Sequence, residues 1–294
     1  WVIDQIQFNE EGNEALLWLA WLDPDTKAII ASEPQQAFAR ISSDMSAWTI
    51  LLEDDADFSK SLIASDLAAF DVVAKSAPPI YVQKDVARIY GGYYLPWEAG
   101  LTKTLTWSVA HTSCNPISYC THSFDFADGT MFPISAAKAG IVYHWKDTCA
   151  NGLTTCTNSI TLEDRSTTPW TYQIYLHLAY NSIPTGLKQV GTAVKMGQFI
   201  GNVDDTGYST GHHVHFMVVA ADTLYKTTSG YYFGRAEDIT FRDVFINWDA
   251  ATQGGRPRLA YETVTYGGEG QTRYLSGNKK MNPLYEQIFP LFFH

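Results

Sequence analysis

The chain has 294 residues, 46% of them hydrophobic and 14% aromatic, which is enough to bury a sizeable core and excludes an intrinsically disordered protein. Its 20 Lys and Arg residues against 31 Asp and Glu residues give a formal net charge of −11. That charge repels phosphates, so neither a nucleic acid nor an anionic membrane surface is expected as a partner. The longest apolar run, residues 15–22, is far shorter than the ~18 residues of a membrane-spanning helix, and no transmembrane segment is expected.

Residues 1–85 are predicted to form a smaller N-terminal α+β module, for which the sequence indicates no role. Strand-like patterns cover Val2–Phe8 and Trp48–Leu52, and residues 13–22 predict a helix between them. The sequence begins at Trp1 without a signal-peptide pattern, a start that is compatible with the removal of a leader or an anchor.

Residues 86–245 are predicted to form the main domain. Short strand-like runs alternate there with turns rich in Gly, Pro, Asn and Asp, a pattern typical of an antiparallel sheet or sandwich. The predicted strands cover residues 105–109, 123–126, 140–144, 160–162, 172–177, 199–203 and 213–220. The expected fold class is therefore mainly β, in the sense of a β-rich α+β protein.

Residues 246–294 are predicted to form a C-terminal extension. The segment is rich in Gly and Arg, and its last residues, 284–294, are strongly aromatic and apolar. We expect this end to pack back on the core; a surface that binds a protein partner is the alternative interpretation.

Four cysteines form two close pairs in the sequence, Cys114 with Cys120 and Cys149 with Cys156. Their spacing does not match the Cys-x-x-Cys knuckles of zinc fingers. Three pairings are possible in principle, and two local disulfides, each closing a short loop, are the favoured interpretation over four unpaired thiols. Disulfides persist in oxidising compartments, so an extracytoplasmic location (secreted, periplasmic or cell-surface) is expected.

Three of the eight histidines fall within four positions, as His212, His213 and His215, at the head of an apolar strand-like run. Side chains alternate across a strand, so His213 and His215 share one face while His212 points away, in a supporting or surface role. Two imidazoles on one face can share a metal ion and its bound water, whereas a helical zinc motif would space them four apart. An ordinary pair of structural strand histidines is the alternative.

Three further segments accompany this histidine strand. They are Thr-His-Ser-Phe-Asp-Phe-Ala at 121–127, continued to an Ala-Ala-x-x-Gly-x-Val stretch at 136–142, then Tyr-Leu-His-Leu at 175–178, and Val-Gly-Thr at 190 running to Gly-Tyr-Ser-Thr-Gly at 207–211. In this order they resemble the lysostaphin-type (LytM-like) zinc metalloendopeptidases, which cleave peptide cross-bridges in peptidoglycan. The resemblance covers about residues 120–220, somewhat under half of the chain. It implies an antiparallel metallopeptidase core.

The resemblance also implies which residues act. In that family a His and an Asp of the first motif and the second His of His-x-His bind Zn²⁺, and the matching residues here are His122, Asp125 and His215. Two neutral imidazoles and one carboxylate leave a fourth position for water, whose pKa the metal lowers towards about 7. His213 is then the expected general base, and His177 the expected hydrogen-bond donor to the oxyanion of the tetrahedral intermediate.

One spacing departs from the family pattern. The family usually has three residues between the first His and the Asp, but His122 and Asp125 have two between them. An offset of three on a strand places side chains on opposite faces, so both reach one ion only through a bulge, or if His122 sits on the loop before the strand. His111 is the reserve ligand. Tyr208 and Ser209, in the turn before the histidines, are candidates to line the substrate groove.

The leading functional hypothesis is an extracytoplasmic zinc-dependent endopeptidase, a hydrolase of peptide bonds in peptidoglycan stem peptides or cross-bridges. The alternative is a non-catalytic structural or scaffolding subunit that keeps the metallopeptidase fold and binds a protein partner through the N-terminal module or the aromatic tail. Asp125, His177, His213 and His215 are all in place, which favours a working site. A zinc peptidase that acts on secreted proteins is a third, weaker interpretation.

Overall fold

The computed structural model describes residues 1–23, 26–42, 47–52, 55, 57–69, 88–107, 120, 122–244 and 273–278. Strands dominate this part of the chain, and its helices are short, namely α1 (Phe58–Ile63), η1 (Asp66–Ala69) and η3 (Thr185–Leu187). The mainly β fold class predicted from the sequence is confirmed. Within the described ranges, no helix is long and apolar enough to cross a membrane.

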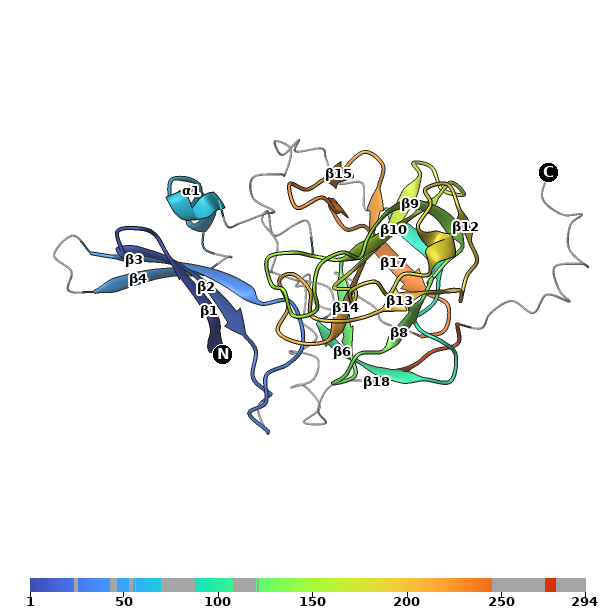
Figure 1. Ribbon diagram of the computed structural model, residues 1–294, viewed down its shortest axis with the longest axis horizontal. Helices are drawn as coiled ribbons and strands as arrows, with labels where there is room; N and C mark the ends of the chain where they lie inside the picture. The colour runs from blue at the N-terminus through green and yellow to red at the C-terminus, as the bar shows by residue number, and fades with distance from the viewer. Residues whose placement is uncertain are drawn as a thin grey trace, which may run out of the picture.

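The N-terminal segment forms a four-stranded antiparallel sheet. Its strands follow chain order, as β1 (Val2–Phe8), β2 (Glu14–Ala20), β3 (Gln35–Ile41) and β4 (Trp48–Leu52). Figure 1 shows this sheet with α1 beside it, to the left of the larger body of the molecule. The strands predicted over 2–8 and 48–52 are confirmed.

The helix predicted over residues 13–22 is wrong, because β2 occupies this stretch. Alternate residues of β2 join two different apolar clusters: Leu16 and Trp18 pack near Phe38, while Ala15 and Leu17 pack with alanines of β3. A strand buried on both faces has no polar alternation and cannot be distinguished from a buried helix by periodicity. Pairing with β1 and β3 on either side then decides the conformation over local helix propensity.

The larger body is built on an eight-stranded antiparallel sheet. Its order is β12 (Ala193–Val194), β9 (Gly140–Lys146), β10 (Ser159–Asp164), β11 (Thr171–Leu176), β14 (His213–Ala220), β7 (Phe124–Ala127), β6 (Thr102–Trp107) and β18 (Arg273–Leu275). Three two-stranded sheets flank it: β13 (Phe199–Asn202) with β8 (Pro133–Ser135), β15 (Tyr225–Lys226) with β16 (Tyr232–Phe233), and β17 (Asp238–Phe241) with β5 (Ile89–Tyr93). Only the last of these described pairs is parallel.

Each strand predicted in this region overlaps an observed one, namely β6, β7, β9, β10, β11, β13 or β14. The limits differ by one to a few residues, as expected for strand ends. For the strand predicted over 105–109, residues 108 and 109 lie outside the described part of the chain.

Strand β14 is buried along its whole length, between β11 and β7. Val214, Phe216 and Val218 belong to the main hydrophobic core. Met217 and Val219 face a smaller apolar cluster on the other side of the sheet. Because His213 and His215 alternate with the core residues, they point to this second face, and it is here that the candidate site is built.

The structure contains the predicted disulfide between Cys149 and Cys156, with their Cα atoms 5.6 Å apart. Cys120 is also disulfide-bonded, and Cys114 lies outside the described residues. In the described part of the C-terminal segment, β18 adds an edge strand to β6. The domain limits 1–85, 86–245 and 246–294 stay a prediction.

Candidate metal centre

Strand register brings Asp125 beside the two strand histidines. In the β14–β7 ladder His215 lies opposite Asp125, and paired residues on neighbouring strands share a face. Oδ1 of Asp125 lies 3.1 Å from Nδ1 of His215, and Oδ2 lies 3.7 Å from Nε2 of His213. All three side chains are fully buried. The structure therefore places these three sequence-predicted residues together.

Hydrogen bonds set the tautomer of His213. Its Nδ1 lies 2.9 Å from the Gly211 carbonyl oxygen and 3.1 Å from the Ser209 hydroxyl. A carbonyl oxygen only accepts, so Nδ1 carries the proton and Nε2 carries the lone pair. That Nε2 atom is buried and has no hydrogen-bond partner. Burial lowers the pKa of His213 to about 4, against the opposing effect of the Asp125 charge, so the ring is neutral at neutral pH.

His177 follows the end of β11 and joins the same group. Its ring centroid lies 4.5 Å from that of His213 and 6.3 Å from that of His215. Its φ of 62° is in the left-handed region, which is sparsely populated by non-glycine residues and recurs at functional sites. Nδ1 donates to the Thr206 carbonyl oxygen over 2.7 Å, and Nε2 therefore faces the site.

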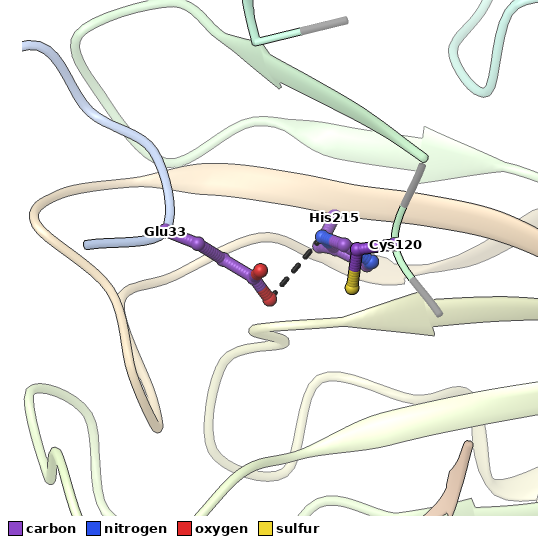
Figure 2. A group of neighbouring side chains, drawn as sticks. All are labelled: Glu33, Cys120 and His215. Atoms are coloured by element: carbon purple, nitrogen blue, oxygen red, sulfur yellow. Dashed lines mark ion pairs between the residues drawn. The ribbon is translucent and has the colours of Figure 1, made fainter. Parts of the chain in front are cut away.

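Glu33, from the connection between β2 and β3, is a site residue that the sequence interpretation missed. Its Oε1 lies 3.2 Å from Nδ1 of His215 and 3.4 Å from Nε2 of His177. Its backbone N–H donates to Oδ2 of Asp125 over 3.0 Å. Figure 2 shows the Glu33 carboxylate pointing at the His215 ring. No local sequence signal marks this residue, because the contact exists only in the tertiary structure.

Electrostatics keep Glu33 ionised. Burial alone raises its pKa, but the neighbouring His215 and the hydrogen bond to His177 outweigh burial and lower the pKa to about 2. Glu33 and His177 shift each other's pKa. Burial lowers the pKa of His177, the Glu33 carboxylate opposes this, and the net effect raises it.

The segment that carries Glu33 is fixed to the turn before β14. Thr210 donates its backbone N–H to the Ser32 carbonyl oxygen over 2.9 Å and receives the Ser32 N–H at its hydroxyl over 3.0 Å. The Thr210 hydroxyl also lies 2.7 Å from the Ile30 carbonyl oxygen. At Gly211 a Cβ atom would stand only 2.9 Å from Cβ of Ala31, so the turn can be approached this closely only because residue 211 is glycine.

The two groove candidates take part in these contacts. Tyr208 stacks on Trp18 of the N-terminal sheet, with ring centroids 5.7 Å apart and an interplanar angle of 20°. Ser209 is buried, donates its hydroxyl to the Gly211 carbonyl oxygen and lies against the His213 ring. In this conformation the side chains of Tyr208 and Ser209 therefore contact other residues of the chain, and their role in a substrate groove stays a prediction.

His122 lies in the turn before β7, with its Nδ1 3.7 Å from Oδ1 of Asp238. Burial lowers its pKa to about 4, and Arg235 adds to the effect. Around His215, the described residues whose ligand atoms all lie within 4.8 Å of one another are Glu33, Cys120 and His215, and His122 is not among them. The ligand set of His122, Asp125 and His215 therefore stays a proposal. The reserve residue, His111, lies outside the described residues.

Comparison with known protein families gives a match for the segment that carries the histidines and Asp125 of this site. Residues 121–226 match the family described as Peptidase family M23. The match covers 106 of the 294 residues, and residues 121–226 are called the M23 segment below. The M23 segment includes Asp125, His177, His213 and His215. Glu33 lies outside it.

Several solved structures were found beside the family match. The catalytic domain of lysostaphin from Staphylococcus simulans is 25% identical over 44% of this chain and 78% of that chain, with a TM-score of 0.28. The catalytic domain of EnpA from Enterococcus faecalis is 22% identical over 42% and 78%, with a TM-score of 0.28. Csd3 from Helicobacter pylori is 13% identical over 89% and 86%, with a TM-score of 0.31. At these TM-scores the likenesses carry no argument, and a comparison with curated proteins found no match.

The residues of the M23 segment fit a zinc ion. Carboxylate and imidazole groups are the donors that Zn²⁺ takes, and Asp125 and His215 present one of each within 3.1 Å. Nε2 of His213 is buried without a hydrogen-bond partner, and the buried Glu33 and Asp125 carboxylates oppose each other electrostatically. A cation relieves that repulsion. The Cys120 sulfur is disulfide-bonded and lacks the thiolate that binds metals.

Proposed function

We propose that this chain is an extracytoplasmic zinc-dependent endopeptidase that hydrolyses peptide bonds in peptidoglycan stem peptides or cross-bridges. The observation that carries the proposal is the convergence of Asp125, His177, His213 and His215 on one buried face of the sheet, inside the M23 segment. The disulfide between Cys149 and Cys156 supports a location outside the cytoplasm.

Asp125 and His215 hold the ion in this proposal, and His122 supplies the third ligand predicted from the sequence. When bound, zinc supplies an activated water at neutral pH and polarises the scissile carbonyl. Glu33 stands in the same group of ligand atoms as His215. In the described conformation it is therefore a fourth candidate donor, and its carboxylate would compete with water for the ion.

His213 is the proposed general base. Its Nδ1 proton is held by the Gly211 carbonyl oxygen, so a proton taken from the attacking water goes to Nε2. The lowered pKa keeps this atom unprotonated before the reaction. The resulting imidazolium lies 3.7 Å from the Asp125 carboxylate, which stabilises the positive charge. The burial that lowers the pKa of His213 favours the later transfer of this proton to the leaving amine.

His177 is the proposed oxyanion donor. Its Nδ1 already donates to Thr206, so Nε2 can donate a hydrogen bond only when the ring is cationic. The raised pKa of His177 favours that form. A cationic donor at this place supports the negative charge that develops on the carbonyl oxygen.

Glu33 makes the described conformation a latent one in this proposal. Its carboxylate contacts His215 and His177, the two groups that the metal and the oxyanion need. Peptide cleavage therefore requires residues 30–33 to leave the turn at 209–211.

Two measurements on the full chain test the proposal. Elemental analysis should find about one zinc per chain at the M23 site, and His215→Ala should remove it. His213→Ala should keep the metal but abolish cleavage of purified peptidoglycan peptides. His144→Ala is the matched control, because His144 lies on β9 outside the site.

A His213→Ala variant that cleaves as fast as the parent overturns the assignment of the base. A chain that folds, binds no zinc at the M23 site and cleaves nothing favours the scaffolding alternative. One observation supports this alternative. His122 lies beside Asp238 and not in the group around His215.

A further inference from the structure

A second group of candidate ligands lies outside the site described above. Asp204 and Asp205 follow β13, and His212 directly precedes β14. Their ligand atoms all lie within 4.8 Å of one another. His212 precedes His213 on the strand and therefore points away from the face that carries Asp125.

Asp204 is the buried member of this group. Its side chain is only 1% exposed, and its Oδ1 lies 3.0 Å from Nδ1 of His212. The Asp205 backbone N–H donates to the same Oδ1 over 2.8 Å. The other oxygen, Oδ2, is buried and has no hydrogen-bond partner. A buried carboxylate oxygen without a donor is unfavourable, and a bound cation satisfies it.

The charges of the group also favour a cation. Burial raises the pKa of Asp204 to about 6, and the adjacent Asp205 contributes to the rise. Burial raises the pKa of Asp205, but the hydrogen bond to Asp204 and, to a smaller extent, the Gly152 backbone N–H favour the ionised form and lower the pKa. Two neighbouring carboxyl groups thus concentrate negative charge in a partly buried place.

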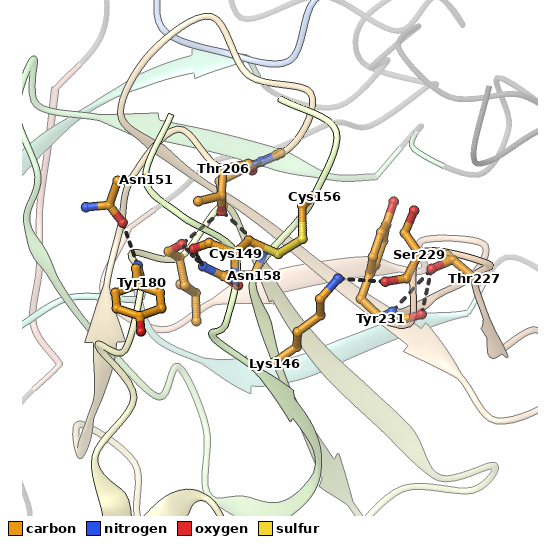
Figure 3. The surroundings of a disulfide bond; sticks show 12 residues. Lys146, Cys149, Asn151, Cys156, Asn158, Tyr180, Thr206, Thr227, Ser229 and Tyr231 are labelled. Carbon is orange, nitrogen blue, oxygen red and sulfur yellow. Dashed lines mark hydrogen bonds between the residues drawn. A yellow bond between two sulfur atoms is a disulfide. The ribbon is translucent and has the colours of Figure 1, made fainter. Parts of the chain in front are cut away.

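The frame around the group is rigid. Gly207, three residues after Asp204, donates its N–H to the Leu153 carbonyl oxygen over 2.9 Å, and a Cβ on it would lie 2.1 Å from Oγ1 of Thr157. Asn158 bonds both the N–H and the carbonyl oxygen of Cys149, over 2.8 and 2.9 Å. Figure 3 shows Asn158 and Thr206 packed against the Cys149–Cys156 disulfide. Ligands on such a frame are preorganised.

We propose that Asp204, Asp205 and His212 bind a second divalent transition-metal ion, of the Zn²⁺ class, separate from the metal centre of the M23 segment. One imidazole nitrogen and two carboxylates suit Zn²⁺, whereas Ca²⁺ takes six to eight oxygen ligands. The ion ties the disulfide loop, through the Asp205 contact with Gly152, to the turn that leads into His213. Its role is structural.

The test is the zinc content of the full chain after equilibrium dialysis against buffered free Zn²⁺. Four proteins are compared: the parent, His212→Ala, His215→Ala and the double variant. His212→Ala should lose about one equivalent in both backgrounds, because loss of even a supporting group at a zinc site costs about 10- to 100-fold in affinity. If the M23 site binds no metal, His215→Ala changes nothing while His212→Ala still loses zinc, so the two proposals fail separately.

Two further variants keep the test independent of folding. Asp204→Asn preserves the shape and the acceptor for the Asp205 N–H but removes the charge, and it should weaken zinc binding as His212→Ala does. His144→Ala removes a histidine elsewhere on the sheet and should leave the zinc content unchanged. Unaltered zinc binding in His212→Ala and Asp204→Asn would show that the two carboxyls share only a proton and overturns the proposal. Displacement of the zinc by an equal concentration of Ca²⁺ overturns the assigned class of ion.

Discussion

The carboxylate of Glu33 lies 3.2 Å from Nδ1 of His215, on the same ring nitrogen that faces Asp125 at 3.1 Å. One histidine atom is thus shared between an acid of the M23 segment and an acid of the N-terminal segment. The Glu33 backbone N–H also binds Asp125 directly. The N-terminal segment is therefore part of the site in this conformation, and the prediction for Glu33 depends on its release.

Glu33→Gln should increase peptidase activity. The glutamine keeps the shape of the side chain but loses the charge that pairs with His215 and His177, and a hydrogen bond to a charged group contributes about 1.5–3 kcal/mol. We therefore expect an increase of about tenfold or more in the initial rate of cleavage of cross-linked peptidoglycan peptides. Glu98→Gln, at an exposed position, is the control. A Glu33→Gln variant no faster than the parent contradicts the latent state.

Ser209→Ala should slow catalysis without loss of metal. The Ser209 hydroxyl lies 3.1 Å from Nδ1 of His213 and helps to orient the ring, while the Gly211 carbonyl oxygen keeps its own bond to that atom. Loss of such a supporting partner reduces activity by about 10- to 100-fold. The decrease should appear in kcat, with KM and zinc content unchanged. An effect on KM alone would instead place Ser209 against the substrate.

Removal of the Cys149–Cys156 disulfide should destabilise the fold. The bond closes a loop with a sequence separation of 7, for which the chain-entropy argument gives about 2–3 kcal/mol. The double variant Cys149→Ser with Cys156→Ser should lower the free energy of unfolding by that amount in urea titrations. The parent under reducing conditions serves as comparison, although Cys120 is reduced there as well. Equal unfolding midpoints for the parent and the double variant would falsify this prediction.

His144 should make stability depend on pH. Burial lowers its pKa from 6.5 to about 4, with Lys226 and Lys146 adding to the effect. The unfolded chain therefore binds a proton between these two values that the folded chain does not bind. The stability associated with neutral His144 is present above pH 6.5 and is lost as the pH falls towards 4.

His144→Gln removes this dependence. Between about pH 8 and about pH 5, the parent should lose on the order of 1 kcal/mol more unfolding free energy than the variant, after a discount for the partial exposure of the ring. Urea titrations at the two pH values measure the difference. Parallel losses in the parent and in His144→Gln would mean that another group controls the pH response.

The sequence by itself determined the strand at residues 213–220 and the face on which His213 and His215 lie. Both follow from local rules: apolar residues of a buried strand run continuously, and side chains alternate with a period of two. The short cysteine spacing similarly predicted the disulfide between Cys149 and Cys156. Such inferences succeed because the atoms concerned are close together in the chain.

Only the tertiary structure decided the rest. Residues 14–20 are apolar at nearly every position, so their conformation was decided by pairing with β1 and β3. The offset of three between His122 and Asp125 left two geometries open, and the structure places His122 beside Asp238. Glu33 enters the site because residues 30–33 are fixed to the turn before β14. The hydrogen bonds of Thr210 to Ser32 hold the two segments together, and Gly211 lets them approach closely. Contacts between segments that are distant in sequence leave no periodic pattern in the sequence, so they can be identified only in the folded structure.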